Sequence, residues 1–308
     1  MRYIKGIEGY TDSAGTAVTL GKFDGLHRGH QKLIDRIRLY AGQDQVRSVV
    51  VAFDMEPLHQ KLGITGQKVI TNSERRYLLE DKVDVLLECP FTEDFYNMKA
   101  EDFIRRILQE RLHARYIVVG EEYRFGDGRR GDAAMLQEWA RQGAFQVDVI
   151  EKERYHDRKI SSTYIKEVLP GGNMELVNRL LGYPYTVIGE VVHGNRIGRT
   201  LGIPTMNLRP DVNKMLPSFG VYVCQVRLAG SWHDGICNIG VKPTVRDNNG
   251  TTIECHLFAY TGDAYGKEIE VRLYHKERGE RKFSDISELK AEMQRNISSG
   301  KEYFINNR

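Results

Sequence analysis

The sequence predicts an α/β chain of two domains, a parallel sheet flanked by helices and then a small antiparallel β-barrel with a terminal helix. In the first half, apolar runs of strand length alternate with amphipathic runs of helical length, which is typical of a parallel sheet covered on both faces. In the second half the hydrophobic period changes to two, and no helix separates the short runs, which favours an antiparallel barrel. Between the halves, Pro170-Gly171-Gly172 breaks a helical pattern. We place the boundary after Gly182, which gives domains of residues 1–182 and 183–308.

The composition is that of an ordinary globular protein. The chain has 308 residues, 41% of them hydrophobic and 28% charged, which is enough for two cores and argues against disorder. A net charge of +3 is too small to indicate a nucleic-acid-binding protein, but it suits a local positive field around an anionic substrate. Charged residues interrupt every apolar run before it reaches membrane-spanning length, and the N-terminus lacks the apolar core of a signal peptide. We therefore expect a cytoplasmic protein.

The four cysteines, Cys89, Cys224, Cys237 and Cys255, form no C-x-x-C pair, and three of them lie in apolar strand-like runs. This placement predicts reduced core residues of a cytosolic protein.

The first half contains five predicted strands and four predicted helices. The strands are Ala17–Leu20, Ser48–Phe53, Val83–Glu88, Tyr116–Val119 and Phe145–Ile150, and the helices are Gln31–Tyr40, Asn72–Lys82, Ala100–Arg111 and Asp132–Gln142. The carboxyl ends of parallel strands meet at one edge of the sheet, where ligands bind. Two glycine-containing loops, Gly21–His30 and Gly120–Gly126, follow predicted strands and should open at that edge.

His27 and His30 stand where the first loop enters a helix. Three positions apart, they share one face of a helix. Its first turn offers free amides and the positive end of the helix dipole, a natural phosphate site. The alternative is a pair of surface histidines. A zinc site is disfavoured, because no third ligand follows at a recognisable spacing.

In the second half, strands are predicted at Tyr185–His193, Gly220–Leu228, Trp232–Ile239, Thr251–Phe258 and Lys267–Tyr274. An amphipathic helix is predicted at Asp285–Ile297, where Asp285 with Glu288 forms a starting cap.

Thr205 and Asn207 close a glycine-punctuated segment, Gly198–Asn207. If this piece is extended, their side chains fall on one face and offer a hydroxyl and an amide oxygen to a hard cation such as Mg²⁺. From spacing alone, a turn-rich hairpin is the more common structure. The segment matches neither the Walker A motif nor the dinucleotide fingerprint.

Two motifs resemble those of a known family. Gly198-Arg199-Thr200-Leu201-Gly202-Ile203-Pro204-Thr205-Met206-Asn207 resembles the signature of bacterial riboflavin kinases, and the loop Gly21–His30 resembles the G-x-F-D-G-x-H-x-G-H motif of nucleotidyltransferases. From end to end, the chain resembles the bifunctional riboflavin kinase/FMN adenylyltransferase (FAD synthetase) family. The resemblance implies a Rossmann-like nucleotidyltransferase domain and a riboflavin kinase-like barrel.

The resemblance also implies residue roles in the first domain. His27 and His30 would contact ATP phosphates and stabilise charge at the α-phosphate. The segment Ile160–Lys166 resembles the family's I-S-S-T-x-I-R signature, whose serine and threonine hold phosphate oxygens. The implied nucleotide-binding residues of this domain are Gly21, Phe23, Asp24, Gly25, Gly29, Gly120, Lys159, Ser162, Thr163 and Lys166.

Five positions depart from the family pattern. Lys159 and Lys166 replace arginines, which exchanges a bidentate fork for a point charge. Met55 and Glu56 replace the proline and histidine of an F-x-P-H-P segment, and Glu122 replaces an aspartate or asparagine. These departures keep open a kinase whose adenylyltransferase domain is degenerate.

In the second domain, Glu254 alternates with apolar neighbours and therefore points away from the apolar face. From the pattern alone it is a solvated strand glutamate. By resemblance it is the general base of the kinase, with Thr205 and Asn207 holding magnesium. The other implied binding residues of this domain are Gly194, Gly198, Arg199, Gly202, Pro204 and Asn238.

We therefore predict an enzyme that uses ATP and Mg²⁺ to phosphorylate riboflavin to FMN, and that transfers AMP from ATP to FMN to give FAD and pyrophosphate. Its partners would be these small molecules, with no nucleic acid and no membrane. A flavin-binding regulatory protein that senses FMN or RNA is the alternative from another class. The sequence shows no arginine-rich or aromatic-interleaved patch for RNA.

Overall fold

The computed structural model describes residues 1–194, 198, 201–241, 250–260, 262 and 264–307. The chain forms two compact units, one of residues 1–66 and 72–162 and the other of residues 67–71 and 163–308. The predicted functional boundary after Gly182 stays a prediction. Across the described residues, no helix is both long and apolar enough to cross a bilayer.

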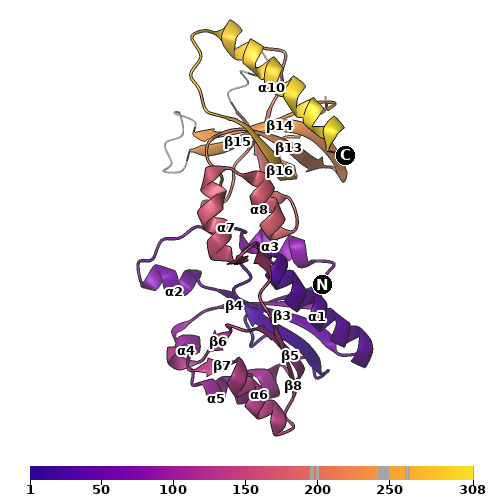
Figure 1. The fold of residues 1–308 in the computed structure, drawn as a ribbon, viewed down its shortest axis with the longest axis vertical. Helices are drawn as coiled ribbons and strands as arrows, with labels where there is room; N and C mark the ends of the chain where they lie inside the picture. Colours follow the sequence, from indigo (N-terminus) through magenta and orange to yellow (C-terminus); the bar gives the residue numbers. More distant parts are fainter. Residues whose placement is uncertain (195–197, 199–200, 242–249, 261, 263, 308) are drawn as a thin grey trace. The chain divides into compact units, whose positions relative to one another are not determined.

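The first unit is built on a six-stranded sheet in the order β1-β4-β3-β2-β5-β8, with all neighbours parallel (Figure 1). The predicted parallel sheet is thus confirmed. The strands are β1 (Arg2–Lys5), β2 (Thr16–Gly21), β3 (Arg47–Asp54), β4 (Val85–Pro90), β5 (Ala114–Gly120) and β8 (Gln146–Ile150). Only β1 was not predicted, because it is short, largely exposed and without an apolar run.

Helices cover both faces of this sheet. Leu33, Ile34 and Ile37 of α1 are buried, while Ile104 of η1 and Leu136 of α6 join the core cluster of the strands. The helices are α1 (Arg28–Asp44), α2 (Glu56–Lys61), α3 (Asn72–Leu79), α4 (Glu93–Tyr96), α5 (Ala100–Asp102), η1 (Phe103–Arg111), η2 (Asp127–Arg129) and α6 (Ala133–Arg141). Two small hairpins pair β6 (Arg124–Phe125) with β7 (Gly131–Asp132), and β9 (Arg154–Tyr155) with β10 (Arg158–Lys159).

The helix predicted at Ala100–Arg111 is a single turn of α-helix followed by the wider π-type helix η1. The amide of Leu112 accordingly donates to the carbonyl of Ile107, five residues back.

The strand order fixes where a ligand can enter the first unit. From β2 the chain continues to β3 and β4 on one side, and later returns to β5 on the other side of β2. The connections that leave β2 and β5 therefore diverge, and ligands of parallel sheets commonly bind at the carboxyl ends of the strands at such a point. Gly21 and Gly120 end these strands, as the sequence predicted for the two loops.

The second unit is a closed antiparallel barrel in the order β11-β12-β15-β14-β13-β16, which confirms the predicted architecture. Its strands are β11 (Tyr185–Val192), β12 (Met206–Leu208), β13 (Gly220–Leu228), β14 (Ser231–Val241), β15 (Thr251–Leu257) and β16 (Glu268–Gly279). The unit also contains α7 (Ser162–Val168) from its second residue on, η3 (Leu169–Gly171) and α8 (Met174–Leu181).

The terminal helix α10 (Ile286–Asn306) packs against the barrel strands β13, β14 and β16 (Figure 1). Asp285 caps it by accepting from the amide of Glu288 at 2.8 Å, as predicted. The helix continues past the predicted end at Ile297, through Gly300, a poor helix former. A Cβ at Gly300 would lie 2.8 Å from the side chain of Ile236, so glycine permits close packing on β14.

Candidate active sites

In the barrel, strand register brings the predicted kinase residues into one row. Glu254 of β15 is the register partner of Asn207 on β12 and of Asn238 on β14, and Asn238 in turn pairs with Val221 on β13. Register partners in an antiparallel sheet point to the same face. The row therefore presents two amides and one carboxylate side by side on the barrel wall.

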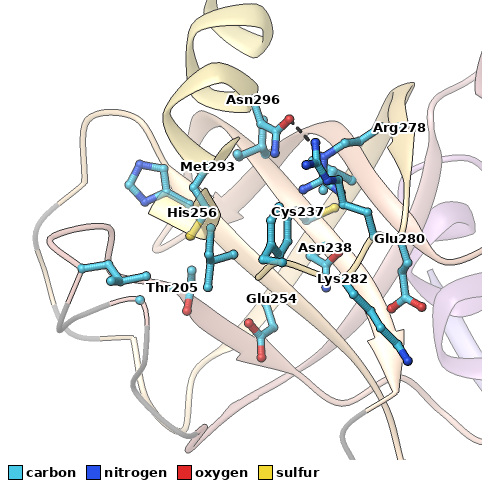
Figure 2. A pocket seen from close by; sticks show the side chains of 17 residues that line it. Thr205, Cys237, Asn238, Glu254, His256, Arg278, Glu280, Lys282, Met293 and Asn296 are labelled. Carbon is cyan, nitrogen blue, oxygen red and sulfur yellow. Dashed lines mark hydrogen bonds between the residues drawn. The ribbon is translucent and has the colours of Figure 1, made fainter. Parts of the chain in front are cut away.

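A cavity of about 590 Å³ adjoins this row. Figure 2 shows Glu254 between Thr205 and Asn238 along its wall. The opposite side is formed by residues of α10, including Met293 and Asn296. Both apolar and charged side chains thus line this cavity, a combination that suits a ligand with an aromatic body and a phosphate end.

Two glycines let the backbone approach the predicted metal ligands closely. A Cβ at Gly194 would lie 2.2 Å from the amide nitrogen of Asn207. A Cβ at Gly198 would lie 2.4 Å from the carbonyl of Ile203 and 3.3 Å from the hydroxyl of Thr205. Both positions therefore exclude any larger residue with the present geometry.

The remaining predicted residues of this segment differ in their placement. Gly202 has φ +76°, a left-handed conformation that favours glycine. The carbonyl of Pro204 lies 2.9 Å from Nδ1 of His256, a neighbour of Glu254 in the cavity wall. Arg199 lies outside the described residues.

The donor set fits magnesium. Thr205 offers a hydroxyl and Asn207 an amide oxygen, while Glu254, the register partner of Asn207, adds a carboxylate. These are the hard oxygen ligands that Mg²⁺ prefers, and it usually retains water and phosphate oxygens for its other positions.

Sequence reasoning missed the charged segment at the end of β16 and just beyond it, which lines the same cavity. Arg278 lies 3.1 Å from Glu292 of α10 and 3.3 Å from the side-chain oxygen of Asn296. Arg281 lies 3.3 Å from the same glutamate. Burial lowers the pKa of Arg278. The dense run of charge at 276–282 was the available signal.

In the first unit, the loop between β2 and α1 is strained. Phe23 has φ 47° and Leu26 has φ 40°, on either side of Gly25 at φ 95°. Left-handed conformations cost non-glycine residues on the order of 1–3 kcal/mol, and such residues cluster at functional sites.

Side chains from three other places hold the carbonyls of this loop. Arg75 donates to the carbonyl of Lys22 at 3.3 Å, and the hydroxyl of Ser162 donates to that of Asp24 at 2.5 Å. Gln31 donates to the carbonyl of Leu26 at 2.9 Å. Ser162 thus contacts the loop through the carbonyl of Asp24, in addition to the phosphate contact that the sequence predicts for it.

His27 and His30 lie together at the start of α1. His27 caps the helix and accepts from the amide of His30, and the two rings stack with centroids 3.7 Å apart. Gly29 packs beside them, since a Cβ there would lie 3.2 Å from the ring of His27. His27 is only 7% exposed, so the alternative of two surface histidines is wrong.

The environment keeps both rings neutral. Burial lowers the pKa of His27 to about 4. Burial, together with the nearby His27, Arg75 and Lys152, holds the pKa of His30 well below 6.5. Among the described residues, the buried Nδ1 of His30 has no hydrogen-bond partner. A phosphate oxygen would satisfy this atom.

A buried ion pair beside the loop was also missed. Arg75 is 3% exposed and lies 3.3 Å from Glu88 in the second half of β4. It also donates to Asn72, which donates in turn to Asp54 at the end of β3. The cluster ties the ends of two strands to α3. A glutamate ending an apolar strand run was the signal.

Two of the departing positions contact each other. Lys159 lies 2.8 Å from Glu122 and 2.8 Å from Glu121. Lys152 also pairs with Glu122, and these two lysines, Lys152 first, lower the pKa of Glu122 to about 2. The two glutamates that follow β5 and the two lysines thus form one exposed cluster of charged side chains.

The other predicted residues are more scattered. Met55 and Glu56 stand at the start of α2, where the amide of Glu56 donates to Asp54. Thr163 and Lys166 lie on α7, within the second unit.

Comparisons with known proteins agree with this organisation. A family model described as FAD synthetase matches residues 10–164, and one described as riboflavin kinase matches residues 181–304. Curated relatives called bifunctional riboflavin kinase/FMN adenylyltransferase are similar over nearly full length. The one from Buchnera aphidicola (Schizaphis graminum) is 35% identical and covers 99% of each chain. The Escherichia coli K12 relative is 33% identical and covers 99% of this chain and 98% of its own.

A solved structure described as a macrolide-efflux protein from Streptococcus pneumoniae shares the fold. It superposes with a TM-score of 0.84 at 27% sequence identity, and the match covers 96% of this chain and 97% of that one.

Proposed function

Since the chain belongs to the bifunctional riboflavin kinase/FMN adenylyltransferase family, we propose that residues 183–308 phosphorylate riboflavin and that residues 1–182 adenylylate the product. The protein is an enzyme of FMN and FAD synthesis with both activities. Riboflavin and ATP give FMN and ADP, and FMN and a second ATP give FAD and pyrophosphate.

The row of Asn207, Glu254 and Asn238, of which Glu254 and Asn238 line the cavity, carries the kinase proposal. Glu254 removes the proton from the terminal ribityl hydroxyl of riboflavin. The resulting oxygen bonds to the γ-phosphorus of ATP as the bond to the leaving ADP breaks. Most of the rate in such a transfer comes from positioning and from charge stabilisation.

Thr205 and Asn207 would hold magnesium, which neutralises phosphate charge when bound. The glycines at 194, 198 and 202, with Pro204, Arg199 and Asn238, form the nucleotide-binding part of the same site. The close approaches at Gly194 and Gly198 support this assignment, since they fix the segment against the two metal ligands.

In the adenylyltransferase, an oxygen of the FMN phosphate attacks the α-phosphorus of ATP and pyrophosphate leaves. His27 and His30, both neutral, donate hydrogen bonds to the phosphate oxygens as charge develops. The strained loop of Gly21, Phe23, Asp24 and Gly25 holds the phosphates at the helix start, with Gly120 on the neighbouring strand. Lys159, Ser162, Thr163 and Lys166 supply further phosphate contacts. The pair formed by Lys159 and Glu122 must open for this role.

We place the enzyme in the cytoplasm, because its four cysteines are free and buried, as is usual in a reducing compartment. Matches to both family models favour the bifunctional enzyme over a kinase alone and over a flavin-binding regulator.

The test is a two-substrate assay with purified protein. Riboflavin and FMN are supplied separately with Mg-ATP and inorganic pyrophosphatase, and the flavins are separated by chromatography. We expect FMN and then FAD from riboflavin, and FAD from FMN. Formation of FMN without FAD would indicate a riboflavin kinase without adenylyltransferase activity. Tight flavin binding without turnover would indicate a flavin-binding regulatory protein.

A further inference from the structure

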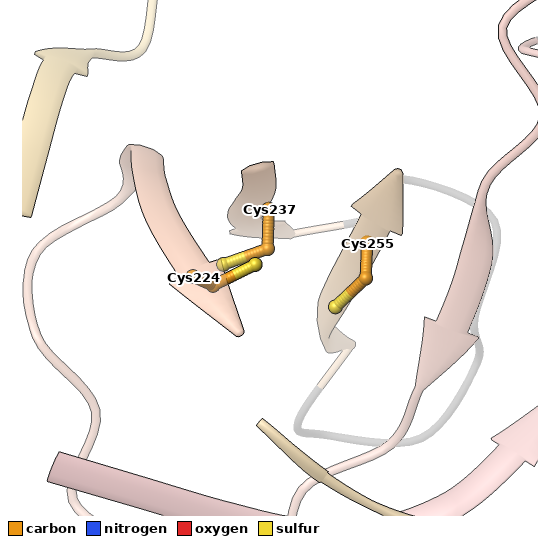
Figure 3. Close-up of side chains that lie close together, drawn as sticks. All are labelled: Cys224, Cys237 and Cys255. Atoms are coloured by element: carbon orange, nitrogen blue, oxygen red, sulfur yellow. The ribbon is translucent and has the colours of Figure 1, made fainter. Parts of the chain in front are cut away.

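Three of the four cysteines converge inside the barrel (Figure 3). Cys224 lies on β13, Cys237 on β14 and Cys255 on β15, and the last two are direct register partners. The three sulfurs all lie within 4.8 Å of one another. None of the three side chains is more than 1% exposed.

The proposed reactions do not use these thiols. Alternation along β14 and β15 turns Cys237 and Cys255 to the opposite face from Asn238 and Glu254, which form the kinase row. Their face is lined by buried residues such as Ile253. An aliphatic side chain would fill this space equally well, so packing alone does not require three sulfurs.

The geometry suits one shared ion with three sulfur ligands. Bonds of about 2.3 Å to a common centre place three sulfurs at most about 4 Å apart, the value for a centre in their plane, and closer together for a pyramidal centre. Separations of up to 4.8 Å reach this arrangement through small rotations of the side chains. Among the described residues, no fourth histidine, cysteine or carboxylate joins the cluster, whereas structural zinc sites normally have four protein ligands.

The net charge of three buried thiolates and a bound ion determines which valence of the ion is favoured. A buried net charge is costly in an apolar interior. Three thiolates around a trivalent ion are neutral, whereas a divalent ion leaves one negative charge and a monovalent ion leaves two. Soft sulfur ligands also select thiophilic ions.

We propose that Cys224, Cys237 and Cys255 form a site for a trivalent thiophilic ion of the arsenic(III) class. Arsenous acid, As(OH)₃, would exchange its three hydroxyl groups for three sulfurs. Each thiol proton leaves with one hydroxyl as water, and neither arsenic nor sulfur changes oxidation state.

The experiment adds arsenite to the reduced, full-length protein and measures the intact mass under native conditions. We expect a gain of one arsenic atom and a loss of three hydrogens. Cys237→Ala and Cys255→Ala should each abolish this three-thiolate adduct. Cys89→Ala is the matched control, since Cys89 is also buried and free but lies in the other unit, and this variant should bind as the unmodified protein does.

A second measurement needs no variant. In crystals soaked with arsenite, anomalous scattering at the arsenic edge should place one atom between the three sulfurs. No arsenic there, or an adduct that survives loss of Cys237 and Cys255, would overturn the proposal. So would displacement of arsenic by an equal concentration of Zn²⁺, since the charge argument predicts that the trivalent ion is retained.

Discussion

Glu254 is the residue on which the kinase proposal depends. Glutamine has the same shape and can accept a hydrogen bond, but it cannot take the proton of the ribityl hydroxyl. Loss of a general base typically lowers the rate about 10²–10⁴-fold. We therefore expect Glu254→Gln to reduce FMN formation from riboflavin by about this factor. FAD formation from supplied FMN should be unchanged.

The matched control is Glu268→Gln, an exposed glutamate on the barrel strand β16, which should leave both reactions intact. If Glu254→Gln phosphorylates riboflavin at the normal rate, Glu254 is a solvated strand residue, as its sequence pattern alone suggested.

The burial of His27 predicts a pH-dependent stability. Its pKa is about 4 in the folded protein and 6.5 in the unfolded chain, so the unfolded chain binds more protons between these values. Stability contributed by the neutral ring is therefore complete above pH 6.5 and is lost as the pH falls towards 4, by about 3 kcal/mol.

This loss can be measured by urea unfolding between pH 4 and pH 7. His27→Asn retains a capping side chain and removes the titrating group, so its stability should decline less steeply in acid. His113→Asn replaces an exposed histidine and should follow the unmodified protein. Equal slopes for all three proteins would show that His27 titrates normally.

At the scale of elements, Gly194 lies against Asn207, one of the two proposed metal ligands. A Cβ at Gly194 would lie 2.2 Å from the amide of Asn207, so Gly194→Ala must displace that side chain. A displacement of about 1 Å can cost about a hundredfold in rate. We expect a loss of that order in kcat/KM for riboflavin phosphorylation, with adenylyl transfer unaffected.

Gly171→Ala serves as the control in the same unit, because nothing lies within 4 Å of the added Cβ. Normal kinase kinetics for Gly194→Ala would mean that the packing against Asn207 is not needed for the reaction.

The ion pair between α3 and β4 predicts a large effect on stability. Glu88→Ala leaves the buried Arg75 without its closest carboxylate, and breaking a buried pair in this way costs about 3–5 kcal/mol. Denaturant unfolding should show this loss. The double variant Arg75→Met with Glu88→Leu should recover most of it, because no buried charge remains. A loss below about 1 kcal/mol for Glu88→Ala would contradict the pairing.

What the sequence predicted at this scale follows from local pattern. Strands with a clear period, such as β13 and β15, were placed within a residue or two. Short elements were not predicted. β1 has too few apolar residues, and the three residues of β12 form a strand through their pairing with β11 and β15. The π-type geometry of η1 could not be read from its helical spacing.

The residues of the candidate sites also divide into those that a local sequence pattern identifies and those that it does not. His27, His30 and Glu254 belong to contiguous motifs, so their neighbours in sequence identified them. Arg75 and Arg278 reach their places through pairing with Glu88 and Glu292, which are distant in sequence or on another element. Charge in a buried run was the only local sign of such pairs.

At the scale of the whole molecule, the strand topology of each unit determines where the residues of its proposed site lie. In the parallel sheet, the strained loop lies at the carboxyl ends of β2 and β5, where the connections diverge. In the barrel, register carries Asn207, Glu254 and Asn238 across three strands. The histidine loop and the row at Glu254, on which the two proposed reactions depend, belong to different units, so a defect in one of them should leave the other reaction intact.

This independence predicts complementation between two inactive variants. Glu254→Gln should make FMN only slowly and His27→Asn should adenylylate it only slowly, so neither variant alone should convert riboflavin to FAD at a normal rate. A mixture of the two should form FAD, because FMN released by one molecule is the substrate of the other. The measurement is FAD formation from riboflavin and Mg-ATP, with each variant alone as the control and FMN addition to Glu254→Gln as the reference. Because free FMN must first accumulate, FAD should appear after a lag that shortens as protein concentration rises.

A mixture that makes FMN but no FAD would show that FMN reaches the second site only within one molecule.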